Sequence, residues 1–304
     1  MRNIFITTLL IFSMGGSHAE GQVAAVLEHP LLGKIVNAQG TPLSQAEVFS
    51  KVKQHRYILV GEKHDNPEHH RLESLIIKAR LAQDSKLHGA VVFEMLDDGQ
   101  NTVLAGLNSS DTLEQMHEKL AWPKKGWDWP SYGPLFHQAA QSSALRAGNI
   151  SKPLIGQLYK EGEQALADKS RFSTVFSATT SIKNHHLDQI FLSHCGMQSR
   201  ETLQPMLTIQ LAKDASMAHA MRTAAPAILI AGGEHIRPQT AVPWHIRQQE
   251  TGADIFVIQL LEARPGETDL NAYIKEAGTA DVYWFTAATA VKDYCAEVRG
   301  KAAQ

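Results

Sequence analysis

Residues 56–67 read Arg-Tyr-Ile-Leu-Val-Gly-Glu-Lys-His-Asp-Asn-Pro: a short apolar run, a glycine, a burst of ionisable side chains and then a helix start. The pattern recurs at residues 227–235, which read Ala-Ile-Leu-Ile-Ala-Gly-Gly-Glu-His. Each copy predicts a strand that leads into Gly-x-x-His. Because ligands in open α/β sheets bind beyond the carboxyl ends of the strands, the two copies predict one shared site at that edge.

Short apolar runs along the chain predict the strands of a sheet. They are Tyr57–Val60, Ala90–Phe93, Pro153–Leu158, Ala227–Ile230 and Ile255–Leu260. Near-continuous apolarity over such short runs suits parallel strands that are covered on both faces. Helical patterns lie between them: Asn66 can cap a helix that starts at Pro67, and residues 202–223 form another. This alternation predicts an α/β fold with a mostly parallel central sheet covered by helices.

Two polar regions, residues 97–143 and 172–223, interrupt the alternation of strand and helix. We expect both to be helical insertions over the carboxyl edge of the sheet. Neither is bordered by a Pro- or Ser-rich linker, so a single domain is predicted for residues 20–304.

The first 19 residues have the pattern of a cleavable signal peptide. Arg2 provides a positive start, an apolar run follows, and Ser17-His18-Ala19 places small residues before a cleavage point. No cysteine that could accept a lipid follows the apolar run. We therefore expect a soluble periplasmic protein rather than a lipoprotein.

The composition narrows the classes of function. A net charge of −2 gives no electrostatic case for a nucleic-acid partner. The two cysteines, Cys195 and Cys295, are either a disulfide, which an oxidising compartment permits, or two buried thiols. The sequence contains no Cys-x-x-Cys-His, which excludes covalent c-type haem attachment. It also has no Walker A motif, no Gly-x-Ser-x-Gly elbow and no His-Glu-x-x-His.

Four ionisable side chains follow predicted strands closely: Glu62, His64, Glu94 and His235. Imidazole and carboxylate together suit zinc, manganese or iron. The same groups can also act as an acid–base pair on a bound substrate, or simply hydrogen-bond loops and helix ends. Because the arrangement is repeated at two strand ends, we interpret it as a functional site.

The remaining histidines are numerous. His69 and His70 lie at a helix start, and His185, His186 and His194 lie in the second insertion. Adjacent helical residues point about 100° apart, so only one of each neighbouring pair can face a given site. We expect these histidines to be solvent-exposed.

An aromatic group at Trp122, Trp127, Trp129 and Tyr132 is interrupted by polar residues, so it is not a helical stripe. One interpretation is a small core that anchors a loop. The other is a wall for a flat apolar ligand, since a tyrosine phenolate can bind ferric haem as an axial ligand.

Several of these segments occur, in order, in blocks that resemble a known family. The blocks are Gly-Glu-Lys-His-Asp-Asn-Pro-Glu-His-His at 61–70, Val-Val-Phe-Glu-Met at 91–95, Trp-Asp-Trp-Pro-Ser-Tyr-Gly-Pro-Leu at 127–135 and Gln-Leu-Ala-Lys-Asp-Ala-Ser-Met-Ala at 210–218. They resemble the ChaN family of haem-binding uptake proteins. That family belongs to a wider group with Tiki, TraB and erythromycin-esterase-like proteins, which has two Gly-x-x-His elements and an acidic residue after an intervening strand. Gly61–His64, Gly232–His235 and Glu94 fit that pattern.

The resemblance implies an α/β fold, haem bound through a tyrosine, a homodimer that can enclose haems between its subunits, and a role in iron acquisition. Tyr132 is the first candidate for the ligand because it lies in a matching block, and Tyr159, after a predicted strand, is the second. His64 or His235 would support the iron or bind a propionate. The expected partners are an outer-membrane haem receptor or a periplasmic haem carrier.

The wider group also makes an alternative plausible, a metal-dependent hydrolase. In that case Glu62, His64, Glu94 and His235 would hold a divalent metal ion or activate water directly.

Overall fold

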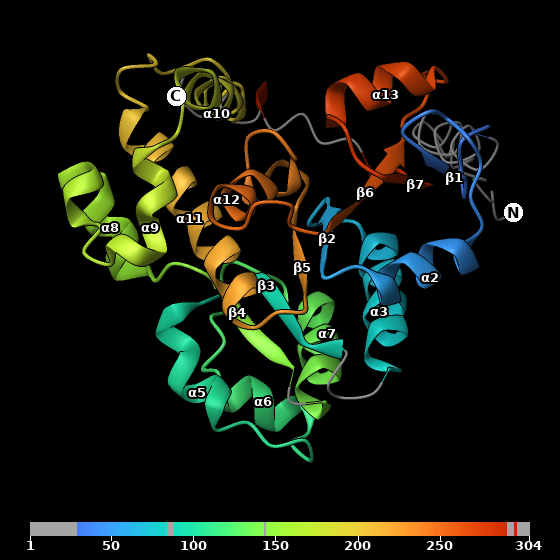
Figure 1. Cartoon of the computed structure of the whole chain (residues 1–304), viewed down its shortest axis with the longest axis horizontal. Helices are drawn as coiled ribbons and strands as arrows, with labels where there is room; N and C mark the ends of the chain where they lie inside the picture. Colours follow the sequence, from blue (N-terminus) through green and yellow to red (C-terminus); the bar gives the residue numbers. More distant parts are fainter. Residues whose placement is uncertain (1–28, 84–87, 143, 291–294, 297–304) are drawn as a thin grey trace, which may run out of the picture.

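The computed structural model describes residues 29–83, 88–142, 144–290 and 295–296, so the predicted signal peptide lies outside the described residues (Figure 1). Within the described chain one sheet has the strand order β1-β7-β6-β2-β5-β3-β4. Its strands are β1 (Ile35–Asn37), β2 (Tyr57–Glu62), β3 (Ala90–Asp97), β4 (Leu145–Asn149), β5 (Ala227–Gly232), β6 (Ile255–Ala263) and β7 (Val282–Ala287). Every neighbouring pair is parallel except β1 and β7. The predicted mostly parallel α/β fold is confirmed.

Helices surround this sheet. They are α2 (Gln45–Gln54), α3 (Pro67–Leu81), α5 (Asn101–Ala105), α6 (Leu113–Lys119), α7 (Trp129–Gln141), α8 (Lys152–Glu161), α9 (Lys169–Phe176), α10 (Thr180–Ser193), α11 (Gln204–Thr223), α12 (Val242–Gln249) and α13 (Leu270–Ala277). Short 3-10 turns add η1 (Asp98–Gln100), η2 (Gly162–Ala165) and η3 (Gly233–Ile236). None of the helices in the described ranges is long and apolar enough to span a membrane.

Alternate side chains of the central strands build two cores, one on each face of the sheet. On one face, Ile58 and Val60 of β2 pack with residues of α2, α3 and α7. On the other face, Tyr57 and Leu59 pack with residues of α11, α12 and α13. Because β2 is fully buried on both faces, its end is held in a fixed position, and the side chains that follow it are placed by the sheet.

The segment after β2 starts α3 as the sequence predicts. The Asn66 side chain accepts hydrogen bonds from the backbone N–H groups of Glu68 and His69, at 2.9 and 3.3 Å, and Pro67 occupies the first helical position. The amide nitrogen of Asn66 also donates to the Ala287 carbonyl at the end of β7. The cap therefore fixes the start of α3 to the same edge of the sheet as the candidate site.

One predicted strand, Pro153–Leu158, is wrong, because these residues lie in α8. Pro153 occupies the first turn of this helix, where its missing N–H is not needed. Leu158 packs into a separate helical core shared by α8, α9, α10 and α11. The strand at that edge of the sheet is β4, which pairs with β3 and whose sequence Leu-Arg-Ala-Gly-Asn is less apolar than the predicted strands.

The two regions expected to be insertions are helical throughout most of their length. Residues 97–143 contain α5, α6 and α7, and α7 packs on the sheet through Phe136, whose ring lies 4.8 Å from that of Phe93. Residues 172–223 include α10 and α11, and α11 places Met217 and Met221 in the core beneath the sheet. Figure 1 shows α8, α9 and α10 gathered at the end of the molecule opposite β1.

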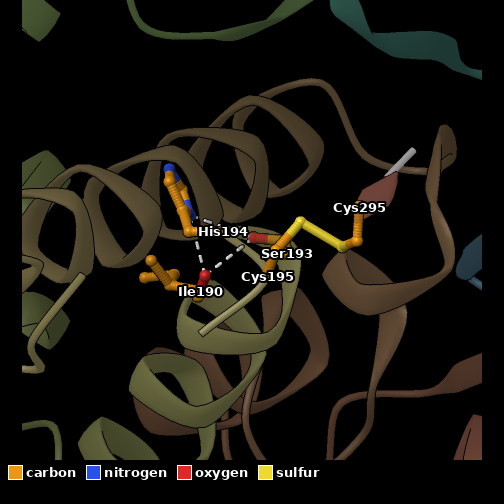
Figure 2. The surroundings of a disulfide bond; sticks show 5 residues. All are labelled: Ile190, Ser193, His194, Cys195 and Cys295. Atoms are coloured by element: carbon orange, nitrogen blue, oxygen red, sulfur yellow. Dashed lines mark hydrogen bonds between the residues drawn. A yellow bond between two sulfur atoms is a disulfide. The ribbon is translucent and has the colours of Figure 1, made fainter. Parts of the chain in front are cut away.

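The two cysteines form a disulfide. Cys195, just after α10, is bonded to Cys295 with their Cα atoms 5.5 Å apart (Figure 2). Local hydrogen bonds close the end of α10: the Ile190 carbonyl accepts from the Ser193 hydroxyl at 2.9 Å and from the His194 ring at 2.7 Å. The disulfide therefore ties Cys295 to the end of α10. Of the two alternatives that the sequence leaves open, the disulfide is confirmed.

Candidate functional site

A groove of about 890 Å³ lies beyond the carboxyl ends of β2, β5 and β6. Both Gly-x-x-His elements line it, through His64 from the first and His235 from the second. Its wall also contains cationic side chains, Lys63 and Arg264, and apolar side chains such as Leu192. This is the edge of the sheet at which a ligand is expected in an open α/β fold.

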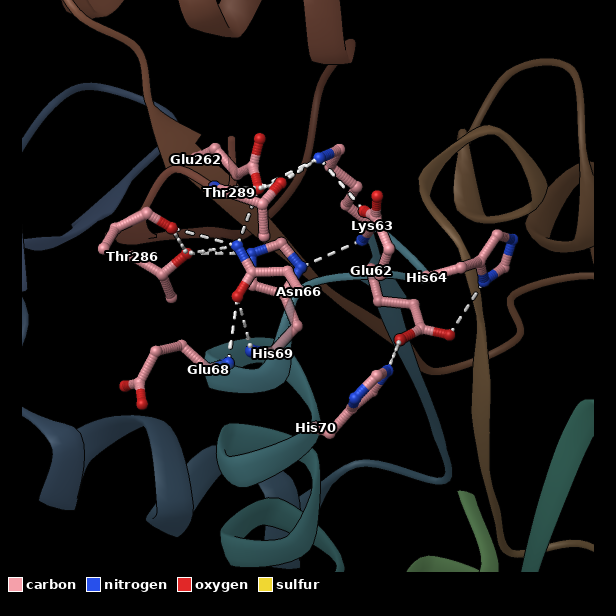
Figure 3. Close-up of polar contacts among 12 residues, drawn as sticks. Glu62, Lys63, His64, Asn66, Glu68, His69, His70, Glu262, Thr286 and Thr289 are labelled. Carbon is pink, nitrogen blue, oxygen red and sulfur yellow. Dashed lines mark hydrogen bonds and ion pairs between the residues drawn. The ribbon is translucent and has the colours of Figure 1, made fainter. Parts of the chain in front are cut away.

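Glu62, the last residue of β2, organises one half of the site. Its Oε1 accepts hydrogen bonds from the Tyr132 hydroxyl at 2.8 Å and from Nδ1 of His64 at 2.9 Å. Its Oε2 lies 3.1 Å from Nε2 of His70, as Figure 3 shows. Burial alone would raise the pKa of Glu62, but its contacts with His64 and His70 lower it to about 2. Glu62 is therefore a buried carboxylate shared between two histidines.

His235 organises the other half. Its Nδ1 lies 2.5 Å from Oδ1 of Asp214 on α11, and its Nε2 lies 3.3 Å from Oε1 of Glu94. The second oxygen of Glu94 accepts a hydrogen bond from the Gly232 backbone N–H at 2.9 Å. Burial would lower the pKa of His235, yet the charges of Glu94 and Asp214 raise it to about 10. His235 is thus an imidazolium held between two buried carboxylates.

The two halves meet at His64 and Glu94, where Nε2 lies 3.9 Å from Oε2. Gly232 permits this approach, because a Cβ at that position would lie 2.8 Å from Nε2 of His64. The His64 side chain remains 37% exposed and faces the groove, whereas Glu62 and Glu94 are buried behind it. The structure therefore brings together all four residues that the sequence singled out, Glu62, His64, Glu94 and His235.

Replacing His235 by glutamine is expected to lower the melting temperature most at pH 6.5 and least at pH 10. The folded-state pKa of about 10 lies above the ordinary value of 6.5. Such a group stabilises the fold fully below pH 6.5 and loses that contribution as the pH rises through 10. Thermal denaturation of the wild-type and variant proteins across this range measures the difference, with the same exchange at the exposed His117 as the control. A difference that stays constant with pH would contradict the assigned charge.

Tyr132 lies at the base of the site, and its hydroxyl faces inward. Its ring is 1% exposed, and the hydroxyl donates to Glu62. Burial, followed by the negative charge of Glu62, raises the pKa of this phenol well above its ordinary value. Formation of a phenolate, which an iron ligand requires, is therefore opposed at this position.

The aromatic residues around Tyr132 form a small core, one of the two interpretations that the sequence allows. Trp122 is buried, and its Nε1–H donates to the Trp127 carbonyl at 2.9 Å. Trp122 and Trp129 both pack against Phe136 of α7. The exception is Trp127, whose ring meets that of His64 at 4.6 Å and so borders the site.

Tyr159 has different surroundings from those predicted. It lies within α8 rather than after a strand, because the predicted strand at Pro153–Leu158 is part of that helix. Its side chain is 52% exposed, whereas Tyr57, Tyr273 and Tyr283 are buried. Among the tyrosines in the described residues, Tyr159 is the one whose ring is open to a ligand from solvent.

The prediction that the other histidines are solvent-exposed is wrong for both His69 and His70, which are buried. Nδ1 of His69 accepts the Lys63 backbone N–H at 2.9 Å, and Nε2 lies 3.0 Å from the Thr286 hydroxyl (Figure 3). Burial lowers the pKa of His69 to about 4, so this imidazole is neutral. His186 is also buried, 2.8 Å from the Thr240 carbonyl. The adjacent rings of His69 and His70 therefore contact different groups: His69 accepts the Lys63 backbone N–H, and His70 faces Glu62.

Sequence reasoning missed three functional neighbours, His70, Glu73 and Asp214. His70 and Glu73 are three residues apart on α3 and therefore share a face. Together with Glu62 they form a buried group whose ligand-type atoms all lie within 4.8 Å of one another. Burial and the nearby charge of Glu62 raise the pKa of Glu73 well above its ordinary value. The sequence feature that could have predicted His70 and Glu73 is their helical spacing after the Gly-x-x-His element, which places their side chains beneath that element.

Comparison with known proteins shows which family the chain resembles. A family model described as "Haem-binding uptake, Tiki superfamily, ChaN" matches residues 48–246. Among solved structures, ChaN of Campylobacter jejuni, described as showing cofacial haem binding, superposes with a TM-score of 0.68 at 23% identity, covering 82% of this chain and 95% of the other. An erythromycin esterase, EreC, gives a TM-score of 0.40 at 12% identity, with 75% and 77% covered. No curated protein matches.

Proposed function

Since the chain belongs to the ChaN family of haem-binding uptake proteins in the Tiki superfamily, we propose that it binds haem non-covalently and takes part in haem or iron uptake in the periplasm. The family match carries this proposal, because it spans both Gly-x-x-His elements, Glu94 and the two candidate tyrosines. The Cys195–Cys295 disulfide supports an oxidising compartment. An outer-membrane haem receptor or a periplasmic haem carrier would be the exchange partner.

The groove offers the chemistry that a haem requires. A porphyrin is flat and apolar, and its two propionates are anionic. Leu192 and Leu260 supply apolar surface in the groove wall. Lys63 and Arg264, whose side chains are 45% and 40% exposed, supply cations that can pair with propionates. The charges of Glu62 and Glu94 raise the pKa of His64 against the effect of burial, so His64 fits a propionate better than the iron.

We assign the axial ligand to Tyr159 rather than to Tyr132. Tyr159 is exposed, whereas the Tyr132 hydroxyl donates to Glu62 inside the core. Tyr159 does not line the groove. We propose that a haem in the groove of one copy is ligated by Tyr159 of the partner subunit.

A homodimer provides that arrangement, and the distribution of apolar surface supports it. The large hydrophobic side chains that the structure leaves exposed are Tyr159, Phe176, Leu192 and Met197. All of them belong to residues 159–197, the segment that contains the end of α8 and all of α9 and α10. We propose that this segment supplies the pairing surface, and two-fold pairing is the commonest assembly of identical chains.

The alternative of a metal-dependent hydrolase built on Glu62, His64, Glu94 and His235 has weaker support. Both ring nitrogens of His235 lie against carboxylates, those of Asp214 and Glu94. A carboxylate beside each ring nitrogen does not itself exclude a metal, because a metal-binding histidine commonly donates its other N–H to an acid. The support is weaker because the matching family is described as haem-binding.

Titration of the purified protein with hemin tests the proposal. We expect a saturable Soret shift and, by size-exclusion chromatography, a haem-dependent increase in the dimer fraction. An unrelated haem-free protein of similar size provides the baseline for non-specific hemin adsorption. Spectra that do not differ from that baseline would overturn haem binding itself, and a shift without dimer formation would overturn only the shared site.

A further inference from the structure

Glu62, His70 and Glu73 form a buried cluster that haem binding does not use. Glu62 comes from the end of β2, and the other two lie one turn apart on α3. Glu73 is 0% exposed, Glu62 is 5% exposed and His70 is 8% exposed. The ligand-type atoms of the three side chains lie within 4.8 Å of one another.

The polar atoms in this cluster are not satisfied by the protein. Neither carboxylate oxygen of Glu73 has a hydrogen-bond partner, and the same holds for Oε2 of Glu62 and Nε2 of His70. The last two atoms lie 3.1 Å apart but are not aligned as a hydrogen bond. A buried acceptor without a donor costs about 1–3 kcal/mol, and more when it is charged. Four such atoms in one buried cluster of three side chains therefore indicate a bound group there.

We propose that Glu62, His70 and Glu73 bind one divalent transition-metal ion, for which zinc is the first probe. One imidazole and two carboxylates are ligands that zinc and manganese accept. A charge of +2 balances both carboxylates, whereas a proton on Glu73 neutralises only one of them. Three ligand atoms at about 2.1 Å from zinc in a tetrahedral arrangement lie roughly 3.4 Å from one another. Closing the present cluster around the ion therefore brings its ligand atoms closer together by up to about 1.4 Å.

The metal supports the groove from behind. Oε2 of Glu62 and Nε2 of His70 face the cluster, whereas Oε1 of Glu62 faces Tyr132 and His64. The edge of the Tyr132 ring also packs against His70, with the ring centroids 4.9 Å apart. An ion in the cluster therefore fixes the carboxylate that holds His64 in place. This inference does not depend on haem binding, and its test uses haem-free protein.

The test measures zinc in protein that has been stripped with a chelator and then exchanged into zinc-containing buffer. We expect one zinc ion per chain after gel filtration and a higher melting temperature with zinc than without it. Substitution by cobalt(II) should produce the visible absorption of a site with nitrogen and oxygen ligands. The same measurements with manganese and with magnesium show whether the site prefers a transition metal or a hard cation.

The variant Glu73→Gln removes one ligand at constant size. We expect at least a tenfold loss of zinc affinity, measured by competition with a chromogenic chelator. The matched control is Glu68→Gln, an exposed position on the same helix, which should bind zinc like the wild type. Equal zinc affinity in the two variants, or a wild-type protein whose melting temperature does not respond to zinc, would overturn the site and favour a proton shared by Glu62 and Glu73. If Glu73→Gln is too unstable to purify, His70→Gln with the cobalt spectrum provides the same comparison.

Discussion

Exchange of Glu94 for glutamine is expected to lower the free energy of unfolding by about 3 kcal/mol, the low end of the range for removing one partner of a buried ion pair. The reason is the imidazolium of His235, which lies 3.3 Å from Glu94 and is 7% exposed. With glutamine in place, its charge would be balanced by Asp214 alone. Glutamine keeps the volume and can still accept the Gly232 N–H, so the loss reports the charge rather than a cavity. Urea denaturation at pH 7 measures it.

A double-mutant cycle separates the ion pair from general disruption of the site. The variant that carries both Glu94→Gln and His235→Gln removes both charges of the contact. We expect the double variant to lose less stability than the two single variants lose together, because no unbalanced imidazolium remains. Purely additive losses would show that the two side chains are not coupled, and the assigned charge of His235 would then be wrong.

The sequence predicts the central strands well, because burial on both faces imposes an unusually simple pattern. β2, β3, β5 and β6 are runs of apolar residues between polar boundaries, and their positions follow from that alone. The error at α8 shows the limit of this signal. A short apolar run such as Pro-Leu-Ile-Gly-Gln-Leu fits a strand or one face of a helix. The local feature that favours the helix is the proline in its first turn.

In the candidate site, too, some residues could be predicted from the sequence and others could not. Glu62, His64, Glu94 and His235 were predicted because each one lies at or closely after the end of a predicted strand, and the parallel sheet brings them to one edge. Asp214 could not be assigned to the site, because α11 supplies it from the other side of the sheet and helical spacing does not say which residue will reach an imidazole. Tyr132 shows a third case. Its block matches the family, yet packing beneath His64 and Glu62 decides that its hydroxyl faces inward.

Exchange of Tyr159 for phenylalanine is expected to lower the affinity for hemin at least tenfold and to change the visible spectrum. The variant loses only the hydroxyl oxygen, which is the atom that would bind ferric iron as phenolate. Because the side chain is 52% exposed, the exchange should leave the melting temperature unchanged. Hemin titration followed by absorption, with resonance Raman detection of an iron–phenolate vibration, measures the loss of the ligand directly.

The matched control is Tyr132→Phe, which removes the same atom from a buried position. There the hydroxyl donates to Glu62 and lies 3.2 Å from the His64 carbonyl. Its removal leaves part of a buried carboxylate without its donor, so we expect a stability loss of about 1–3 kcal/mol and an iron–phenolate signal that persists in the haem complex. The reverse result, loss of the phenolate signal in Tyr132→Phe but not in Tyr159→Phe, would return the ligand to Tyr132. That outcome would require α7 to withdraw from Glu62 when haem binds, because the present packing leaves the phenol no path to an iron atom.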